Sequence, residues 1–150
     1  RYIKSSKENK KILKHGYIVI EASGGSPTQS TGRTVLIRNS LLSNIEKPLY
    51  FSNFSKMIIP KDNYSIFLYL LLNNLYQRDV FFHFEGKTSG IKNLLLNNLI
   101  KKLEYVSPSI DILEKFEEQL GVIWDKIFNL GNENEILGET RDLLIKKLIR

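Results

Sequence analysis

Residues 17–33 read YIVIEASGGSPTQSTGR, an apolar run followed directly by a polar, glycine-rich segment. The β-branched run predicts a buried strand over Tyr17–Ala22, because such side chains pack well on a pleated surface. In segment 24–33, three glycines and a proline permit a sharp, closely approaching backbone, while Ser, Thr, Gln and Arg offer hydrogen-bond donors. The segment contains no acid, His or Cys, so it favours contact with an anionic or hydrogen-bonding partner over proton transfer. A polar loop that merely joins two strands is the alternative.

The chain has the length and apolar content of one ordinary domain, or of a domain with an appended element. It contains 150 residues, of which 42% are hydrophobic, enough for a real core. It has no cysteine, which excludes a disulfide framework and a cysteine-based zinc site. The longest apolar run, Ile66–Leu72, is far too short to cross a bilayer. We therefore expect a cytoplasmic protein without a membrane partner, and the start at Arg1 leads us to expect a fragment of a longer chain.

The net charge of +6 is unevenly distributed along the chain. Residues 1–61 hold 11 Lys and Arg against 3 Asp and Glu, whereas residues 109–150 hold 6 against 9, a change from +8 to −3. A basic surface attracts phosphate backbones through counterion release. The pattern therefore indicates a basic body that binds nucleic acid and a mildly acidic tail with another task. A solvated, lysine-rich surface without a partner is the alternative.

Short strands mixed with two helices predict an α+β (mixed α/β) fold. We expect a target-binding domain over residues 1–108, lacking its beginning, and a helical region over 109–150. Within the first part, after the strand at 17–22, the pattern predicts strands at 34–37, within 49–59, at 80–84 and at 103–106, and helices at 65–76 and 88–100.

The tail carries a heptad pattern. Ser109 is a candidate helix cap, and the apolar seam that follows has steps of 3, 4, 3, 4 and 3: Leu113, Phe116, Leu120, Ile123, Ile127 and Leu130. Gly131 and the Asn- and Glu-rich residues 132–135 interrupt this seam, after which the same phase resumes. An amphipathic stripe must be buried against something. Pairing with a partner helix is the main expectation, and folding back on its own domain is the alternative.

The sequence offers little support for catalysis. His15 and His83 lack a metal-ligand spacing. Gly86-Lys87-Thr88 resembles the end of a phosphate-binding P-loop, but residue 81 is Phe where that motif requires Gly. Glu21 has no evident partner as a general base and could instead balance Arg33. We therefore expect a non-enzymatic chain with no catalytic residue, metal or cofactor.

Five segments, in order, resemble one known family. Residues 17–33 look like its "I-E-x-S-G-G-S-P-x-Q-x-T-G-R" stretch, and residues 50–56 (YFSNFSK) resemble the strand that follows. Residues 84–94 (FEGKTSGIKNL) look like a "G-T-x-x-x-x-L" turn into a helix, residues 106–108 like an "I-x-x-P" close, and residues 141–148 (RDLLIKKL) like an "R-x-x-L-L-x-K-L-L" helix end. Together they resemble the specificity (S) subunits of type I restriction–modification systems. One departure is the usual Gln that opens the long helix, which is replaced here after Pro108.

The resemblance implies a DNA-binding subunit that reads half of a bipartite target and docks methyltransferase (M) subunits, and through them the restriction subunit. Candidate DNA contacts are Gln29, Ser30, Thr31 and Arg33, then Lys87, Thr88 and Ser89, with Lys4, Lys7, Lys10, Lys11 and Lys14 as phosphate contacts on composition. The seam would pack on the other long helix of an S subunit, or on a second copy of the chain.

Three other interpretations stay open. Segment 24–33 could stabilise the domain while other residues read bases. The chain could be a helical adaptor whose basic domain binds protein or RNA. It could also be the specificity part of a fused restriction–methyltransferase, with a catalytic domain upstream.

Overall fold

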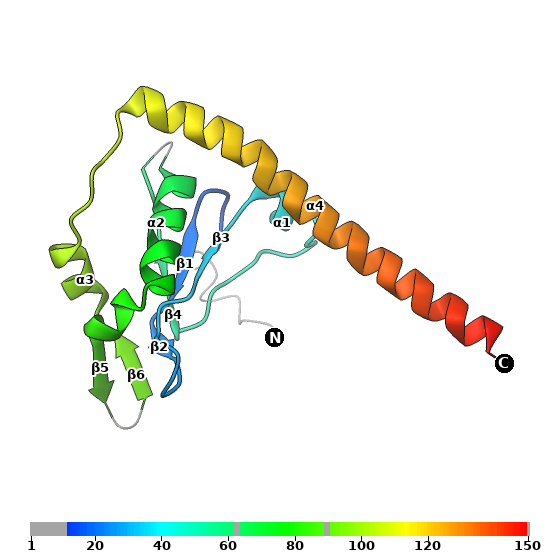
Figure 1. Cartoon of the computed structure of the whole chain (residues 1–150), viewed down its shortest axis with the longest axis horizontal. Helices are drawn as coiled ribbons and strands as arrows, with labels where there is room; N and C mark the ends of the chain where they lie inside the picture. Colours follow the sequence, from blue (N-terminus) through cyan, green and yellow to red (C-terminus); the bar gives the residue numbers. More distant parts are fainter. Residues whose placement is uncertain (1–11, 62–63, 89–90, 150) are drawn as a thin grey trace.

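The computed structural model describes residues 12–61, 64–88 and 91–149, with the side chains of residues 87 and 88 left aside. Two small antiparallel sheets and several short helices form a body, and one long C-terminal helix lies across it and projects beyond it (Figure 1). The predicted α+β class with a long C-terminal helix is therefore confirmed.

The first sheet is built around the apolar run at residues 17–22. β1 (Ile18–Glu21) is its central strand and pairs antiparallel with β3 (Thr34–Leu36) and β4 (Ser55–Ile58). Successive side chains of a strand point to opposite faces, and Ile18 and Ile20 are accordingly both fully buried. The strands predicted at 17–22, at 34–37 and within 49–59 are present.

The second sheet holds the start of the glycine-rich segment. β2 (Ser23–Gly24) pairs antiparallel with β6 (Ile91–Leu94), which pairs antiparallel with β5 (Glu85–Thr88). Ser23 Oγ donates a hydrogen bond of 2.5 Å to Asn93 Oδ1, 70 residues later in the chain. The glycine-rich segment is thus attached to a hairpin that is remote in sequence.

Helices cover these sheets and complete the core. They are α1 (Asn39–Leu42), α2 (Ser65–Gln77), the 3₁₀ helix η2 (Val80–Phe84), α3 (Leu96–Lys102) and α4 (Ile110–Leu148). The helix predicted at 65–76 is confirmed as α2. The buried core joins both sheets with α2, η2 and α3: Ile18, Ile20, Leu36, Ile66, Leu72, Phe81, Leu94 and Leu99.

Three sequence-based element predictions are wrong. Residues 80–84 form a 3₁₀ turn, not a strand, because the chain reverses at Asp79 (φ 59°) directly after α2 and Phe81 turns into the core. The helix predicted over 88–100 begins only at Leu96, because the preceding residues pair with β2 and this tertiary pairing overrides their local periodicity. Residues 103–106 belong to an irregular connection, not to a strand.

α4 is one continuous helix of 39 residues, about 58 Å long at 1.5 Å per residue. It begins after Ser109 as predicted, and it passes through Gly131 without a break, although Gly131 interrupts the apolar seam. The reason is that one glycine costs a helix interior only about 1 kcal/mol, and the flanking residues maintain the hydrogen-bond ladder.

The heptad seam divides into two parts along α4. Leu113 is fully buried, and Phe116 and Leu120 pack against the core. Ile123, Ile127 and Leu130 are 53%, 63% and 43% exposed. A 3.5-residue repeat drifts by about 20° per heptad around a straight helix, so the seam rotates away from the body as the helix continues. The first half of α4 therefore lies on the body, while the second half projects from it (Figure 1).

Candidate nucleic-acid interface

The glycine-rich segment 24–33 has a backbone that only glycine tolerates at several positions. Gly24, Gly25 and Gly32 have φ values of 153°, 73° and 124°. A Cβ atom on Gly25 would lie 2.8 Å from the carbonyl oxygen of Gln29, and one on Gly32 would overlap the ring of Phe81. The segment folds into a small closed turn, in which Ser26 N donates to Gln29 O at 2.9 Å. Its glycines are therefore required by the packing of the domain itself.

Two carboxylates hold the end of this segment in place. Glu21 accepts hydrogen bonds from Arg33 Nη2 at 2.8 Å, from Arg33 Nε at 3.1 Å and from Gly32 N at 3.4 Å. Glu85 Oε1 accepts a hydrogen bond of 2.6 Å from Thr31 N, and Glu85 Oε2 lies 3.0 Å from Lys92 Nζ. The hydrogen bond from Arg33 lowers the pKa of Glu21 below its ordinary value of 4.5, against the opposing effect of burial. The expected balance of Arg33 by Glu21 is thus confirmed.

The structure separates the four candidate contacts of this segment. Gln29 is exposed, and the side chain of Arg33 is 58% exposed despite its ion pair with Glu21. Ser30 and Thr31 are 2% and 0% exposed, and Thr31 Oγ1 donates to the carbonyl oxygen of Gly24 at 3.2 Å. In this conformation their hydroxyl groups face the inside of the domain, so only Gln29 and Arg33 are presented to a ligand.

The other candidate contacts are placed only in part. Lys14 is exposed on the body. Lys87 and Thr88 belong to β5 by their backbone, but their side chains lie outside what the structure describes. Outside the described residues altogether lie Ser89, Lys4, Lys7, Lys10 and Lys11.

A hollow of about 810 Å³ opens beside the glycine-rich segment. The backbone of residues 24–27 forms one wall, and Phe82, Ile91, Glu85 and Lys92 line the rest. Lys92 Nζ lies 4.7 Å from the centroid of the Phe82 ring. Sequence reasoning missed Phe82 and Lys92, because residues 80–84 read as a strand and residues 88–100 as a helix. Only the fold brings them to residues 24–27.

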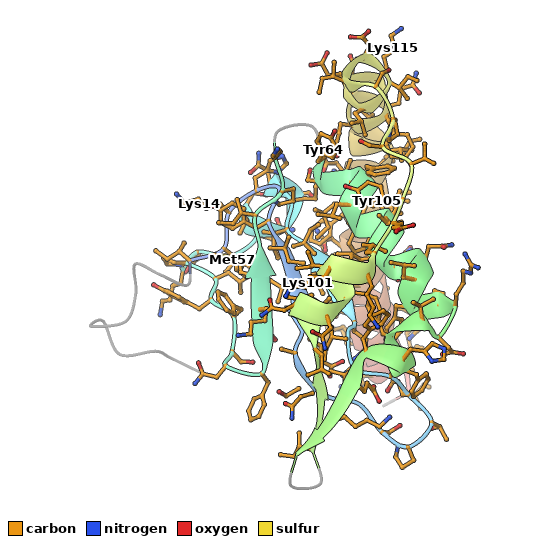
Figure 2. All side chains as sticks on the ribbon, turned by 90° about the vertical axis from the view of Figure 1, so that its left-hand side faces the viewer. Lys14, Met57, Tyr64, Lys101, Tyr105 and Lys115 are labelled. Carbon is orange, nitrogen blue, oxygen red and sulfur yellow. The ribbon has the colours of Figure 1, made fainter. Side chains whose placement is uncertain are left out.

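Several further lysines are exposed on the body, and the sequence did not single them out. Lys56 lies on β4, and Lys101 and Lys102 end α3. Lys14 and Lys101 lie on opposite sides of β4 on the face shown in Figure 2. By contrast, Arg33, Arg38 and Lys92 are engaged in ion pairs with Glu21, Asp125 and Glu85. These exposed lysines are therefore better placed for phosphate contact than the three cations in ion pairs.

The described part of the chain contains neither a candidate metal site nor a membrane-spanning helix. Its His, Asp and Glu residues nowhere form a group of three or more that could hold a metal ion. Among the helices that the structure describes, none is long and apolar enough to cross a membrane.

Comparison with known proteins identifies one informative relative. The chain is 30% identical over 129 residues to the type I restriction enzyme HindI specificity subunit of Haemophilus influenzae. This chain is similar to a specificity subunit. The match covers 82% of the chain, so it includes part of α4, but only 27% of the relative. The chain therefore spans about a quarter of the length of that specificity subunit. No family model and no solved structure matches the chain.

Proposed function

We propose that this chain is a target-recognition domain and long helix of a type I restriction–modification specificity subunit. In this function the body binds double-stranded DNA at one half of a bipartite target, and α4 joins the body to the rest of a cytoplasmic complex. The observation that carries the proposal is the similarity to a specificity subunit, because it extends over both the body and part of α4. Methyl transfer and cleavage would reside in other subunits, so the chain itself would be non-catalytic.

The exposed polar groups of the body support DNA binding. Gln29 and Arg33 stand on the surface of the glycine-rich segment, and both residue types recognise base edges through paired hydrogen bonds. Lys14, Lys56 and Lys101 would contact phosphates, which orient a protein on the duplex without reading sequence. The buried Ser30 and Thr31 would support the segment from inside.

The projecting half of α4 supports a role in assembly. The d positions of the heptad in this half are apolar and exposed by 43% to 58%: Leu130, Leu137 and Leu144. An exposed stripe of this kind normally pairs with another helix. We expect the other long helix of a specificity subunit, or a second copy of the chain, to cover it. Methyltransferase subunits would dock on the resulting helical pair.

DNA binding is tested by fluorescence anisotropy with a pool of random 30-bp duplexes at two salt concentrations, followed by selection of the bound fraction. We expect affinity to fall steeply with salt and the selected fraction to converge on one short half-site. Binding without enrichment would support the adaptor interpretation instead. No binding at low salt would refute the proposal.

The substitution Arg33→Ala tests whether the glycine-rich segment contacts DNA. We expect it to weaken binding to the selected half-site by roughly 5- to 150-fold, equivalent to about 1–3 kcal/mol for a base contact. The matched control is Arg141→Ala, since Arg141 is also an exposed arginine in an ion pair but lies on the projecting part of α4. Equal binding by both variants would assign segment 24–33 to domain stability alone. Co-purification with the neighbouring methyltransferase subunit tests the assembly role separately.

A further inference from the structure

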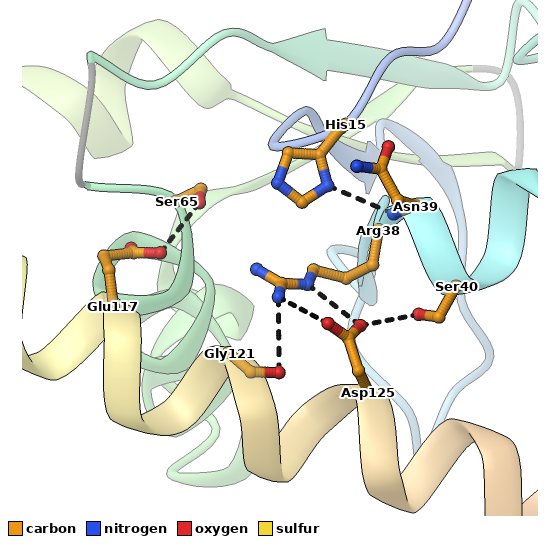
Figure 3. A network of polar contacts seen from close by, with 8 residues as sticks. All are labelled: His15, Arg38, Asn39, Ser40, Ser65, Glu117, Gly121 and Asp125. Atoms are coloured by element: carbon orange, nitrogen blue, oxygen red, sulfur yellow. Dashed lines mark hydrogen bonds and ion pairs between the residues drawn. The ribbon is translucent and has the colours of Figure 1, made fainter.

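α4 is attached to the body by polar contacts at two points on one side of the helix. Glu117 and Asp125 are eight residues apart, which places them about 12 Å apart along the helix axis. Each accepts hydrogen bonds from a different element of the body (Figure 3).

The first point is Glu117, which caps the N-terminus of α2. It accepts hydrogen bonds from Ile66 N at 2.5 Å, from Ser65 Oγ at 3.1 Å and from Phe67 N at 3.4 Å. The first N–H groups of a helix lack partners within it, and its N-terminal dipole end attracts an anion. The N-cap residue of α2, Tyr64, provides no side-chain hydrogen bond for these groups. Glu117 from α4 therefore supplies a cap that α2 does not supply itself.

The second point is Asp125, which binds Arg38 at the start of α1. Arg38 donates from Nη2 to Asp125 Oδ2 at 3.0 Å and from Nε to Oδ1 at 3.4 Å, while Ser40 Oγ donates to Oδ1 at 2.8 Å. Arg38 Nη2 also donates to the carbonyl oxygen of Gly121 at 3.3 Å. The side chain of Arg38 is only 11% exposed, so this two-bond contact has a defined geometry.

Apolar contacts lie on the same side of α4. Leu113 is fully buried, and the ring of Phe116 meets that of Phe67 edge-on with centroids 6.5 Å apart. Trp124 meets Tyr69 in the same way at 5.1 Å. Contacts spread from 113 to 125, about 18 Å of helix, fix both the tilt and the rotation of α4 on the body. Farther along, a Cβ on Gly131 or Gly138 would meet no described atom within 4 Å.

From this arrangement we infer that Glu117 and Asp125 are positioning residues that set the direction in which α4 leaves the body. Between Asp125 and Leu148 the helix extends by about 35 Å, so a tilt of about 10° at the attachment would move its end by roughly 6 Å. Successive base pairs are separated by about 3.4 Å. This part of the inference rests on the proposed function: two bodies joined through their long helices would meet DNA at a spacing and helical phase fixed by these contacts.

The direction of α4 can be measured directly, because the chain has no cysteine of its own. Spin labels on Asn74→Cys in α2 and Glu139→Cys in α4 report the distance between the body and the projecting helix; both positions are exposed. The labelled chain is diluted into unlabelled chain, which removes distances between copies. We expect one narrow distance distribution. In the double variant Glu117→Gln/Asp125→Asn, we expect a distribution that is broader or displaced by several ångströms.

The matched control is Glu118→Gln/Asp142→Asn, which makes the same chemical changes at exposed positions of the same helix. It should leave the distribution unchanged. If the first double variant does not fold, Asp125→Asn alone is measured, with Asp125→Glu as the charge-retaining variant expected to restore the narrow distribution. An unchanged distribution in folded Asp125→Asn or in the folded double variant would overturn the inference.

DNA selection separates this inference from the proposed function. Duplexes selected by two unsubstituted copies paired through α4 should contain two copies of the half-site at one spacing, and those selected by paired copies of Glu117→Gln/Asp125→Asn should contain them at several spacings. If neither chain enriches any sequence while the distance distributions differ as expected, the proposed function fails and the positioning of α4 stands. If both chains select the same single spacing, these contacts do not determine the spacing.

Discussion

The substitution Gly32→Ala tests whether the glycine-rich segment is shaped by the domain or by a ligand. Gly32 has a φ of 124°, and its Cα faces the ring of Phe81, which is fully buried. An alanine there must adopt a backbone conformation that L-residues rarely occupy. Its methyl group must also displace an aromatic ring at the centre of the core.

The expected cost follows from these two effects. An unfavourable backbone conformation of this kind costs about 1–3 kcal/mol, and overpacking a well-filled core costs about 1–3 kcal/mol more. The smaller entropy of unfolded alanine returns about 0.4–1 kcal/mol. We therefore expect the free energy of unfolding to fall by about 1–6 kcal/mol, against the roughly 5–15 kcal/mol typical of a domain.

Urea unfolding followed by circular dichroism measures this change. With a slope near 2 kcal/mol per molar urea, the midpoint should fall by about 0.5 M or more. Gly131→Ala is the matched control; it lies in the exposed part of α4 and should stabilise the helix by about 0.5–1 kcal/mol. In the double variant Gly32→Ala/Phe81→Leu, the two losses should be less than additive, because the smaller side chain relieves the overlap. A loss below about 1 kcal/mol for Gly32→Ala would refute the reasoning.

Three further predictions concern the helix and two titrating groups. Ile127→Asp should abolish self-association in sedimentation without changing the melting temperature of the body. Leu120→Asp should lower that melting temperature, because Leu120 packs on the core. Equal effects of the two variants on the melting temperature would contradict the division of α4 into an attached part and a projecting part. Burial lowers the pKa of His15 from 6.5, with Arg38 adding to the shift. As pH falls, His15 therefore takes up its proton in the unfolded chain before it does so in the folded chain, and stability should fall as pH drops below 6.5. In His15→Gln, the urea midpoint should depend less on pH between pH 7.5 and 5. Glu21 has a lowered pKa, so its contribution to the free energy of unfolding should be lost as pH falls below 4.5. If Glu21→Gln loses stability just as steeply in acid, Glu21 does not make this contribution.

The elements predicted best from the sequence are those whose own apolar residues, by their type and spacing, indicate a buried strand or helix. β1 was expected from a β-branched run, and α2 from apolar positions at helical spacing; both are present because both bury those residues in one core. The elements around residues 80–106 were predicted poorly. Their conformation depends on pairing between β2 and β6, and local periodicity contains no information about a partner so distant in the chain.

The same limit applies to the candidate interface. Residue types in segment 24–33 identified possible donors, but not which of them point outward. Thr31 is buried, and its backbone N–H donates to Glu85, far along the chain. A buried carboxylate that binds a backbone N–H is invisible to motif reasoning, since Glu85 reads as an ordinary polar residue. The exposed Lys56 and Lys101 were missed because isolated lysines form no pattern in the sequence.

The heptad seam has a buried part and an exposed part on one helix. A seam with a period of 3.5 residues stays on one line only if the helix supercoils around another helix. In a straight helix it turns slowly out of any flat contact, so Leu113 is buried against the body and Ile127 is exposed on the same helix. Three further residues of α4 that contact the body lie beside the seam and were not part of the predicted pattern: Glu117, Trp124 and Asp125. Two carboxylates of the acidic tail thus attach the helix to the body, while the apolar seam is exposed farther along the same helix.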